Sequence, residues 1–151
     1  MLSKWTLHRF VFFPPADLHR PVFRKSFQMS SAHLSLEAPC IHRYPGPYEV
    51  GVVCERHIDN PVPVEGSVRF AVTFEDSSGS QRSHFVGENR RIGRVRWSGP
   101  SLNGFGLARY EVPENVPEME PLLCRFEFED LEGALAHYRP AHAYSKNIFR
   151  P

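Results

Sequence analysis

Three stretches of this chain alternate strictly between apolar and polar or small residues. They are PYEVGVVCER, SVRFAVTFED and LLCRFEFED. A strand places successive side chains on opposite faces, so this period of two predicts strands with one buried and one solvated face. A helix would rotate neighbours by about 100° and mix the two properties around its surface. The predicted core positions are Tyr48, Val50, Val52, Cys54, Val68, Phe70, Val72, Phe74, Leu122, Cys124, Phe126 and Phe128.

Shorter stretches predict further strands, about eight in all. They are HLSLEA, RSHFVG, GRVRWSG, FGLARYEVP, the tail after Pro140 and the N-terminal WTLHRFVFF. DSSGS at residues 76–80 predicts a hairpin turn, and HIDNPVPVEG predicts a longer loop that its prolines keep out of a sheet. In VPENVPEMEP a proline at every fourth residue predicts an extended crossover between sheets. We expect at most one short helix, in DLEGALAHY.

These elements predict an all-β protein. The chain has 151 residues, 14 of them Pro and 10 Gly, and its short strands are separated by turn signals. This organisation favours an antiparallel β-sandwich, immunoglobulin-like or jelly-roll-like. We expect one domain over residues 1–151, with residues 1–32 as an irregular N-terminal segment packed on it.

Composition and charge narrow the class of protein. No stretch approaches the roughly 20 apolar residues of a membrane span, and no signal peptide is recognisable, so a soluble, intracellular (cytoplasmic) protein is expected. The net charge is +1, which gives no general attraction to nucleic acid or to a membrane. Residues 1–100 hold 13 Lys+Arg and 9 Asp+Glu, whereas residues 101–151 hold 5 and 8. The two sets of charged side chains either mix on one solvated surface, or they form separate basic and acidic regions that a charged partner could recognise.

Two of the strand segments resemble each other, because both carry Arg-Phe and then end in Phe-Glu-Asp. The acidic ends could form a paired carboxylate site around Asp76 and Asp130. Acid–base chemistry needs carboxylates that converge in a pocket, and nothing local brings these two together. The structural interpretation is favoured, with each Glu-Asp marking where a strand leaves the core.

Histidine and cysteine offer weak candidates for catalysis or metal binding. Cys40 and His42 share a face if their segment is a strand, and His137 and His142 form a second pair. The chain has no CxxC, HExxH or GxSxG motif, and Cys54 and Cys124 fall at apolar positions where thiols are inert. No catalytic residue, metal or cofactor is therefore predicted. A small hydrolase or metal-dependent enzyme using these His and Cys residues is the second alternative.

The most specific local feature is ENRRIGRVRWSG. Arginine beside an aromatic residue suits anionic or planar groups, through bidentate hydrogen bonds and stacking. We predict Arg91, Arg94, Arg96 and Trp97 as a surface for an acidic protein partner, with no nucleic-acid motif beside it. The competing interpretation is an edge strand that charges protect from pairing. An alternative ligand site is an aromatic platform of Trp97, Phe105 and Tyr110 for carbohydrate or another small ligand.

The C-terminal CRFEFEDLEGAL, with the extended stretch after it, resembles small bacterial β-sandwich domains of unknown function. The resemblance covers about 30 residues and carries no catalytic motif. Some domains of this kind act as immunity or accessory proteins. The sequence therefore predicts a non-enzymatic protein-binding module, with an immunity or accessory protein of a bacterial toxin system as one form of it. The alternative is a carbohydrate or small-ligand module.

Overall fold

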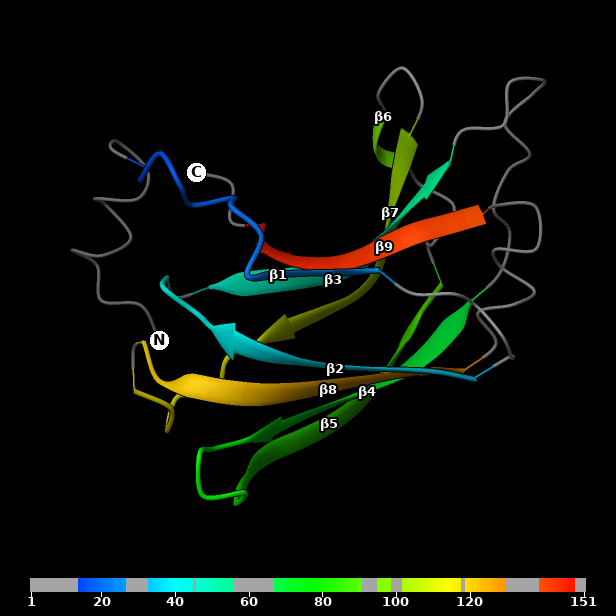
Figure 1. Ribbon diagram of the computed structural model, residues 1–151. Coiled ribbons are helices and arrows are strands. Elements are labelled where there is room, and N and C mark those ends of the chain that lie inside the picture. Colours follow the sequence, from blue (N-terminus) through cyan, green and yellow to red (C-terminus); the bar gives the residue numbers. More distant parts are fainter. Residues whose placement is uncertain are drawn as a thin grey trace.

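The protein is all-β in the computed structural model, which describes residues 14–26, 33–44, 46–55, 67–90, 95–98, 102–117, 119–129 and 139–148. Two antiparallel sheets pack face to face as a β-sandwich, which confirms the predicted fold class (Figure 1). One sheet has the strand order β1-β9-β3-β7-β6 and the other β2-β8-β4-β5. The strands are β1 (Phe23–Ser26), β2 (His33–Ile41), β3 (Pro47–Glu55), β4 (Val68–Glu75), β5 (Gln81–Asn89), β6 (Val95–Ser98), β7 (Leu102–Glu111), β8 (Pro121–Glu129) and β9 (Arg139–Asn147).

The chain changes sheet at almost every connection. Two connections are hairpins that stay within one sheet. The β4–β5 hairpin turns at Asp76–Ser80 in the four-stranded sheet, as DSSGS predicts, and the β6–β7 hairpin belongs to the five-stranded sheet. The β7–β8 connection crosses between the sheets as predicted, but it is not extended. The Val116 N–H donates to Pro113 O (3.0 Å) and the Glu120 N–H to Pro117 O (3.3 Å). The prolines therefore open tight turns, for which their fixed φ is suited.

The core follows the predicted alternation. The apolar positions of β3, β4 and β8 all belong to the interior, and Phe74, Phe105, Phe126 and Phe128 are 0% exposed. Phe70 is only partly buried, at the side of the core next to β5. The pattern identified which face of each strand turns inward because side chains alternate strictly along a pleated backbone.

The repeated Arg-Phe…Phe-Glu-Asp segments are neighbouring strands. β4 and β8 pair antiparallel, so the acidic end of each strand lies close to an arginine of the other. Arg69 Nη2 lies 3.1 Å from Glu129 Oε2, and Arg125 Nη1 lies 3.8 Å from Glu75 Oε1. Antiparallel pairing thus carries the two acidic ends apart. Asp76 closes the β4–β5 turn, and Asp130 lies outside the described residues.

The outer face of β3 departs from the prediction of a solvated surface. Glu49 is 2% exposed and Val53 is 1% exposed. Glycines make room for large side chains there: a Cβ on Gly51 would lie 2.6 Å from the Tyr144 hydroxyl, and one on Gly106 would lie 2.5 Å from Glu49 Cδ. Tyr144 of β9 therefore lies across Gly51 of β3, and Glu49 of β3 lies across Gly106 of β7. The alternation identified the core face correctly, but it carried no information about what covers the opposite face.

The N-terminal segment is more regular than expected. Residues 23–26 form β1, which pairs with β9 at the edge of the five-stranded sheet. Only Phe23 faces the core while the next three residues are exposed, so no alternation signals this strand. The predicted strand WTLHRFVFF, the loop HIDNPVPVEG and the helix in DLEGALAHY lie outside the described residues. No helix in the part of the chain that the structure describes is long and apolar enough to cross a membrane.

Candidate binding pocket

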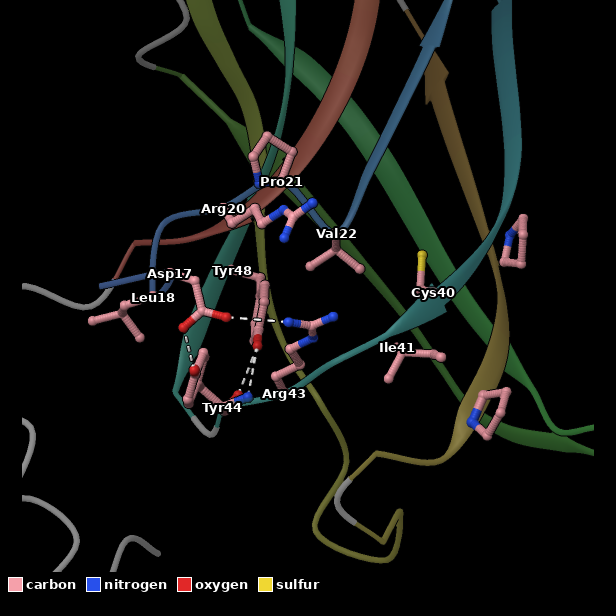
Figure 2. Close-up of a pocket in the computed structure, with 12 residues that line it drawn as sticks. Asp17, Leu18, Arg20, Pro21, Val22, Cys40, Ile41, Arg43, Tyr44 and Tyr48 are labelled. Atoms are coloured by element: carbon pink, nitrogen blue, oxygen red, sulfur yellow. Dashed lines mark hydrogen bonds and ion pairs between the residues drawn. The ribbon is translucent and has the colours of Figure 1, made fainter. Parts of the chain in front are cut away.

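A pocket opens at one end of the sandwich, between the turn before β1 and the end of β2 (Figure 2). Its volume is about 470 Å³, within the range of small-ligand sites. The walls come from residues 17, 18 and 20–22, from residues 39–41, 43 and 44, and from Tyr48 and Pro121. These segments belong to different sheets, so the pocket spans the opening between the two layers.

The turn that forms one wall is fastened to the end of β9. Leu18 is 2% exposed and anchors the turn in the interior. The ring Nδ1 of His19 lies 2.9 Å from Asn147 O, and the Val22 N–H donates to Ser145 O at 2.6 Å. Because backbone groups of β9 hold it at two points, the turn presents its remaining side chains to the pocket in a defined position.

Asp17 connects the two walls. Its carboxylate accepts hydrogen bonds from the Tyr44 hydroxyl and from Arg43 Nη1, the latter at 3.1 Å (Figure 2). The hydrogen bond from Tyr44 and the neighbouring Arg43 guanidinium hold the pKa of Asp17 below its ordinary value, and the same bond raises the pKa of Tyr44. Asp17 is therefore ionised at neutral pH and neutralises Arg43 across the pocket.

Arg20 is the second cation of the pocket. Its backbone N–H donates to Asp17 O, so it follows Asp17 in the same turn. Among the described residues, none accepts a hydrogen bond from its exposed guanidinium or forms an ion pair with it. The adjoining wall is apolar, with Val22 half-buried and Ile41 44% exposed. The pocket therefore combines an available guanidinium with an exposed aliphatic surface.

The base of the pocket is rigid and polar. The Tyr48 hydroxyl donates to Tyr44 O at 2.7 Å, and burial raises the pKa of Tyr48. The Tyr48 ring stacks on Tyr110 with centroids 5.7 Å apart. Behind them the Tyr110 hydroxyl lies 3.0 Å from His42 Nε2 and 2.6 Å from Ser145 Oγ. This interior network fixes the aromatic rings on which the pocket rests.

Cys40 and His42 are core groups. Both point inward from the end of β2, as predicted for residues two apart, and they are 1% and 6% exposed. Burial lowers the pKa of His42 to about 4, and a hydrogen bond with the Cys40 thiol together with burial raises the pKa of Cys124. All three cysteines are free and buried. His137 lies outside the described residues, within which no group of three His, Cys, Asp or Glu side chains could hold a metal ion.

The predicted arginine surface lies partly outside the described residues. This holds for Arg91 and Arg94, whereas Arg96 and Trp97 belong to the backbone of β6, with side chains that are not described. β6 is the last strand of its sheet, which agrees with the edge-strand interpretation of this segment. The role of these four residues in binding stays a prediction.

The predicted aromatic platform is wrong for two of its three residues. Phe105 is 0% exposed and Tyr110 is 3% exposed, both within the core, so neither can offer a ring face to a sugar. The register of β7 explains the difference: it shifts against β3 between Val50 and Gly51, and both rings turn inward beside Tyr48 and Val52. The third residue, Trp97, has no described side chain.

Sequence reasoning missed the pocket residues. Asp17, Arg20, Arg43 and Tyr44 lie in the proline-framed segments PPADLHRP and HRYPGPY, which have no hydrophobic period. Their proline framing was the available signal, because prolines fix the backbone of surface turns that carry binding residues. Comparison with known proteins found no matching family model, no matching curated protein and no matching solved structure.

Proposed function

We propose that this protein is a non-enzymatic binding module that recognises an acidic segment of a protein partner. The observation that supports this most is the Arg20 guanidinium, which has no partner among the described residues and lies beside an exposed aliphatic wall. Guanidinium groups bind carboxylates through paired, charge-assisted hydrogen bonds. A carboxylate next to an apolar side chain matches both parts of this pocket.

Asp17 restricts where that carboxylate can bind. Its own carboxylate already pairs with Arg43 and accepts from the Tyr44 hydroxyl, so Arg20 is the cation that a partner carboxylate would bind. The apolar neighbour of that partner carboxylate would cover Ile41, which is 44% exposed. An inhibitor of the immunity-protein type, acting on a toxin, is one form that such a module takes.

Paired peptide libraries test the proposal. One library displays Asp or Glu next to Phe or Leu, and the other replaces the acids with Asn or Gln. We expect binding from the acidic library alone, weakened by added salt because the pocket is open to solvent. Arg20→Gln should weaken binding on the order of tenfold, as removal of a charge-assisted bond predicts. Arg43→Gln should also weaken it, because the Asp17 carboxylate would lose its cationic partner and repel an acidic ligand. Arg24→Gln, exposed on β1 and outside the pocket lining, should not.

Two results would overturn the proposal: equal binding of both libraries, or unchanged affinity in Arg20→Gln and Arg43→Gln. Titration of free propionate distinguishes a small-ligand site from a peptide site. If propionate binds as tightly as the best acidic peptide, the pocket serves a small carboxylate and the protein-partner assignment fails. Backbone chemical shifts of residues 17–22 and 39–44 report in each case whether the ligand enters this pocket.

A further inference from the structure

The two edges of the four-stranded sheet differ in how they are protected. At the β2 edge, inward-facing Leu36 and Cys40 are 2% and 1% exposed, and Lys25 Nζ of β1 donates to Glu37 O at 3.0 Å. A side chain from β1 of the other sheet thus reaches this edge and satisfies one of its backbone acceptors. Unprotected edges present rows of backbone donors and acceptors that pair with another strand.

The β5 edge is open in the described part of the chain. All four of its inward-facing residues remain half-buried, whereas the corresponding residues of β8 are buried. Its described ladder partner is β4 alone, on one side (Figure 1). Phe85 packs on Phe70 and Phe74, with centroids 6.4 and 6.3 Å apart, but stays half-buried. Val86, on the outer face, is 73% exposed. The strand has nine residues and no proline, and among the described strands only β4 pairs with it.

The sequence of β5 is complementary to itself. In an antiparallel pair of identical strands, a two-fold axis through Phe85 places Arg82 opposite Glu88 of the second copy, and the same pair recurs on the other side of the axis. Val86 then faces His84 of the second copy. Arg82, His84, Val86 and Glu88 are all exposed. The register of β5 against β4 shifts between Phe74 and Glu75, so Arg82 is the extra residue of a β-bulge and would meet Glu88 of the second copy at the end of the regular ladder of residues 83–89.

Other registers match less well. An axis through Val86 would place Arg82 opposite Arg90 of the second copy, and an axis through His84 would pair no opposite charges. An axis between two residues would pair an outward with an inward side chain, because directly opposed residues in an antiparallel sheet share a face. Charge and pleat together therefore select Phe85 as the centre.

We propose that two copies of this chain associate through β5, antiparallel about Phe85, and join their four-stranded sheets into one sheet of eight strands. The second copy would supply hydrogen bonds to the open edge and cover Phe85 and Val86. Arg82 already lies 2.8 Å from Asp76 and 3.7 Å from Glu120, and Glu88 lies 2.9 Å from Arg90. Each charge therefore has a partner within its own chain, and the second copy would extend these pairs across the two-fold axis.

Charge exchange tests the pairing. Arg82→Glu should bring a second carboxylate opposite Glu88 of the other copy, and Glu88→Arg should place two guanidinium groups together. Each single variant should weaken dimerisation on the order of tenfold in analytical ultracentrifugation, since like charges repel in both symmetric pairs. The double variant restores opposite charges across the axis and should dimerise more tightly than either single variant, although it loses the ion pairs with Asp76 and Arg90 within each chain. An equimolar mixture of the two single variants should form heterodimers.

Stability and a matched charge serve as controls. Circular dichroism should show each single variant folded, and recovery in the double variant cannot arise from unfolding. Arg24→Glu, exposed on β1 at the far edge of the other sheet, should leave dimerisation unchanged. A wild-type protein that stays monomeric across the accessible concentration range would overturn the proposal. So would single variants that dimerise as tightly as the wild type, or a double variant that dimerises no better than the single ones.

Discussion

The Nε2 atom of His42 lies 3.0 Å from the hydroxyl of Tyr110 in the interior of the sandwich. Burial lowers the pKa of His42 to about 4, so the imidazole is neutral in the folded protein at neutral pH. Three aromatic rings surround it, with the Tyr48 ring closest at 4.7 Å between centroids. A proton added here must enter an apolar environment, which links the protonation of this residue to folding.

Folding stability should fall as the pH decreases from about 6.5 to about 4. The unfolded chain binds a proton at His42 near its ordinary pKa of 6.5, whereas the folded chain does so only near 4. The loss over this window amounts to at most roughly 3 kcal/mol from this residue. Urea denaturation at several pH values measures it. His42→Gln should reduce this pH dependence and His84→Gln should not, while a contribution from His142, whose pKa burial also lowers, should remain. The same pH dependence in His42→Gln as in the wild type would contradict the assignment.

Gly51→Ala should be far more destabilising than Gly79→Ala. A Cβ on Gly51 would lie 2.5 Å from the backbone oxygen of Phe105 on the adjoining strand, which cannot move without disturbing the ladder. We expect a loss of roughly 2–3 kcal/mol from such overpacking. Gly79 has open space around it but a φ of +78°, so alanine there should cost about 1 kcal/mol. Equal losses in denaturation experiments would show that β3 and β7 are not packed this closely.

The three thiols should resist alkylation in the folded protein. Cys40, Cys54 and Cys124 are each no more than 1% exposed, and burial raises the pKa of Cys54 to about 12. The thiolate is the reactive form, so neither access nor ionisation favours reaction with iodoacetamide near neutral pH. Mass spectrometry should detect no label before denaturation and three labels after it. Rapid labelling of the native protein would contradict the burial of these side chains.

The paired ends of β4 and β8 should contribute little to stability. The side chains of Arg69 and Glu129 are 64% and 52% exposed, so solvent screens their ion pair. A double-mutant cycle with Arg69→Ala and Glu129→Ala should give a coupling below about 1 kcal/mol. Phe126→Ala, in the core of the same strand pair, should cost about 3–5 kcal/mol. A coupling energy between Arg69 and Glu129 larger than the stability lost in Phe126→Ala would contradict this prediction.

The arrangement of the pocket was not predictable from local pattern. Arg43 and Asp17 are separated by 26 positions in the chain, and no periodicity relates their two turns. The turns meet because His19 and Val22 attach one of them to β9, more than 120 positions later. Such contacts depend on which strands become neighbours. The local sequence of PPADLHRP or HRYPGPY predicts only a turn framed by prolines.

The sequence by itself determined the strands of the core and the face that each turns inward. Alternation along Tyr48–Cys54, Val68–Phe74 and Leu122–Phe128 did this, because the pleat relates each residue to its neighbours within one strand. Only the tertiary structure decided which strands pair, that β5 has a single ladder partner among the described strands, and that Arg20 and Asp17 face a common pocket. Those relationships join residues far apart in the chain, and a local period carries no information about them.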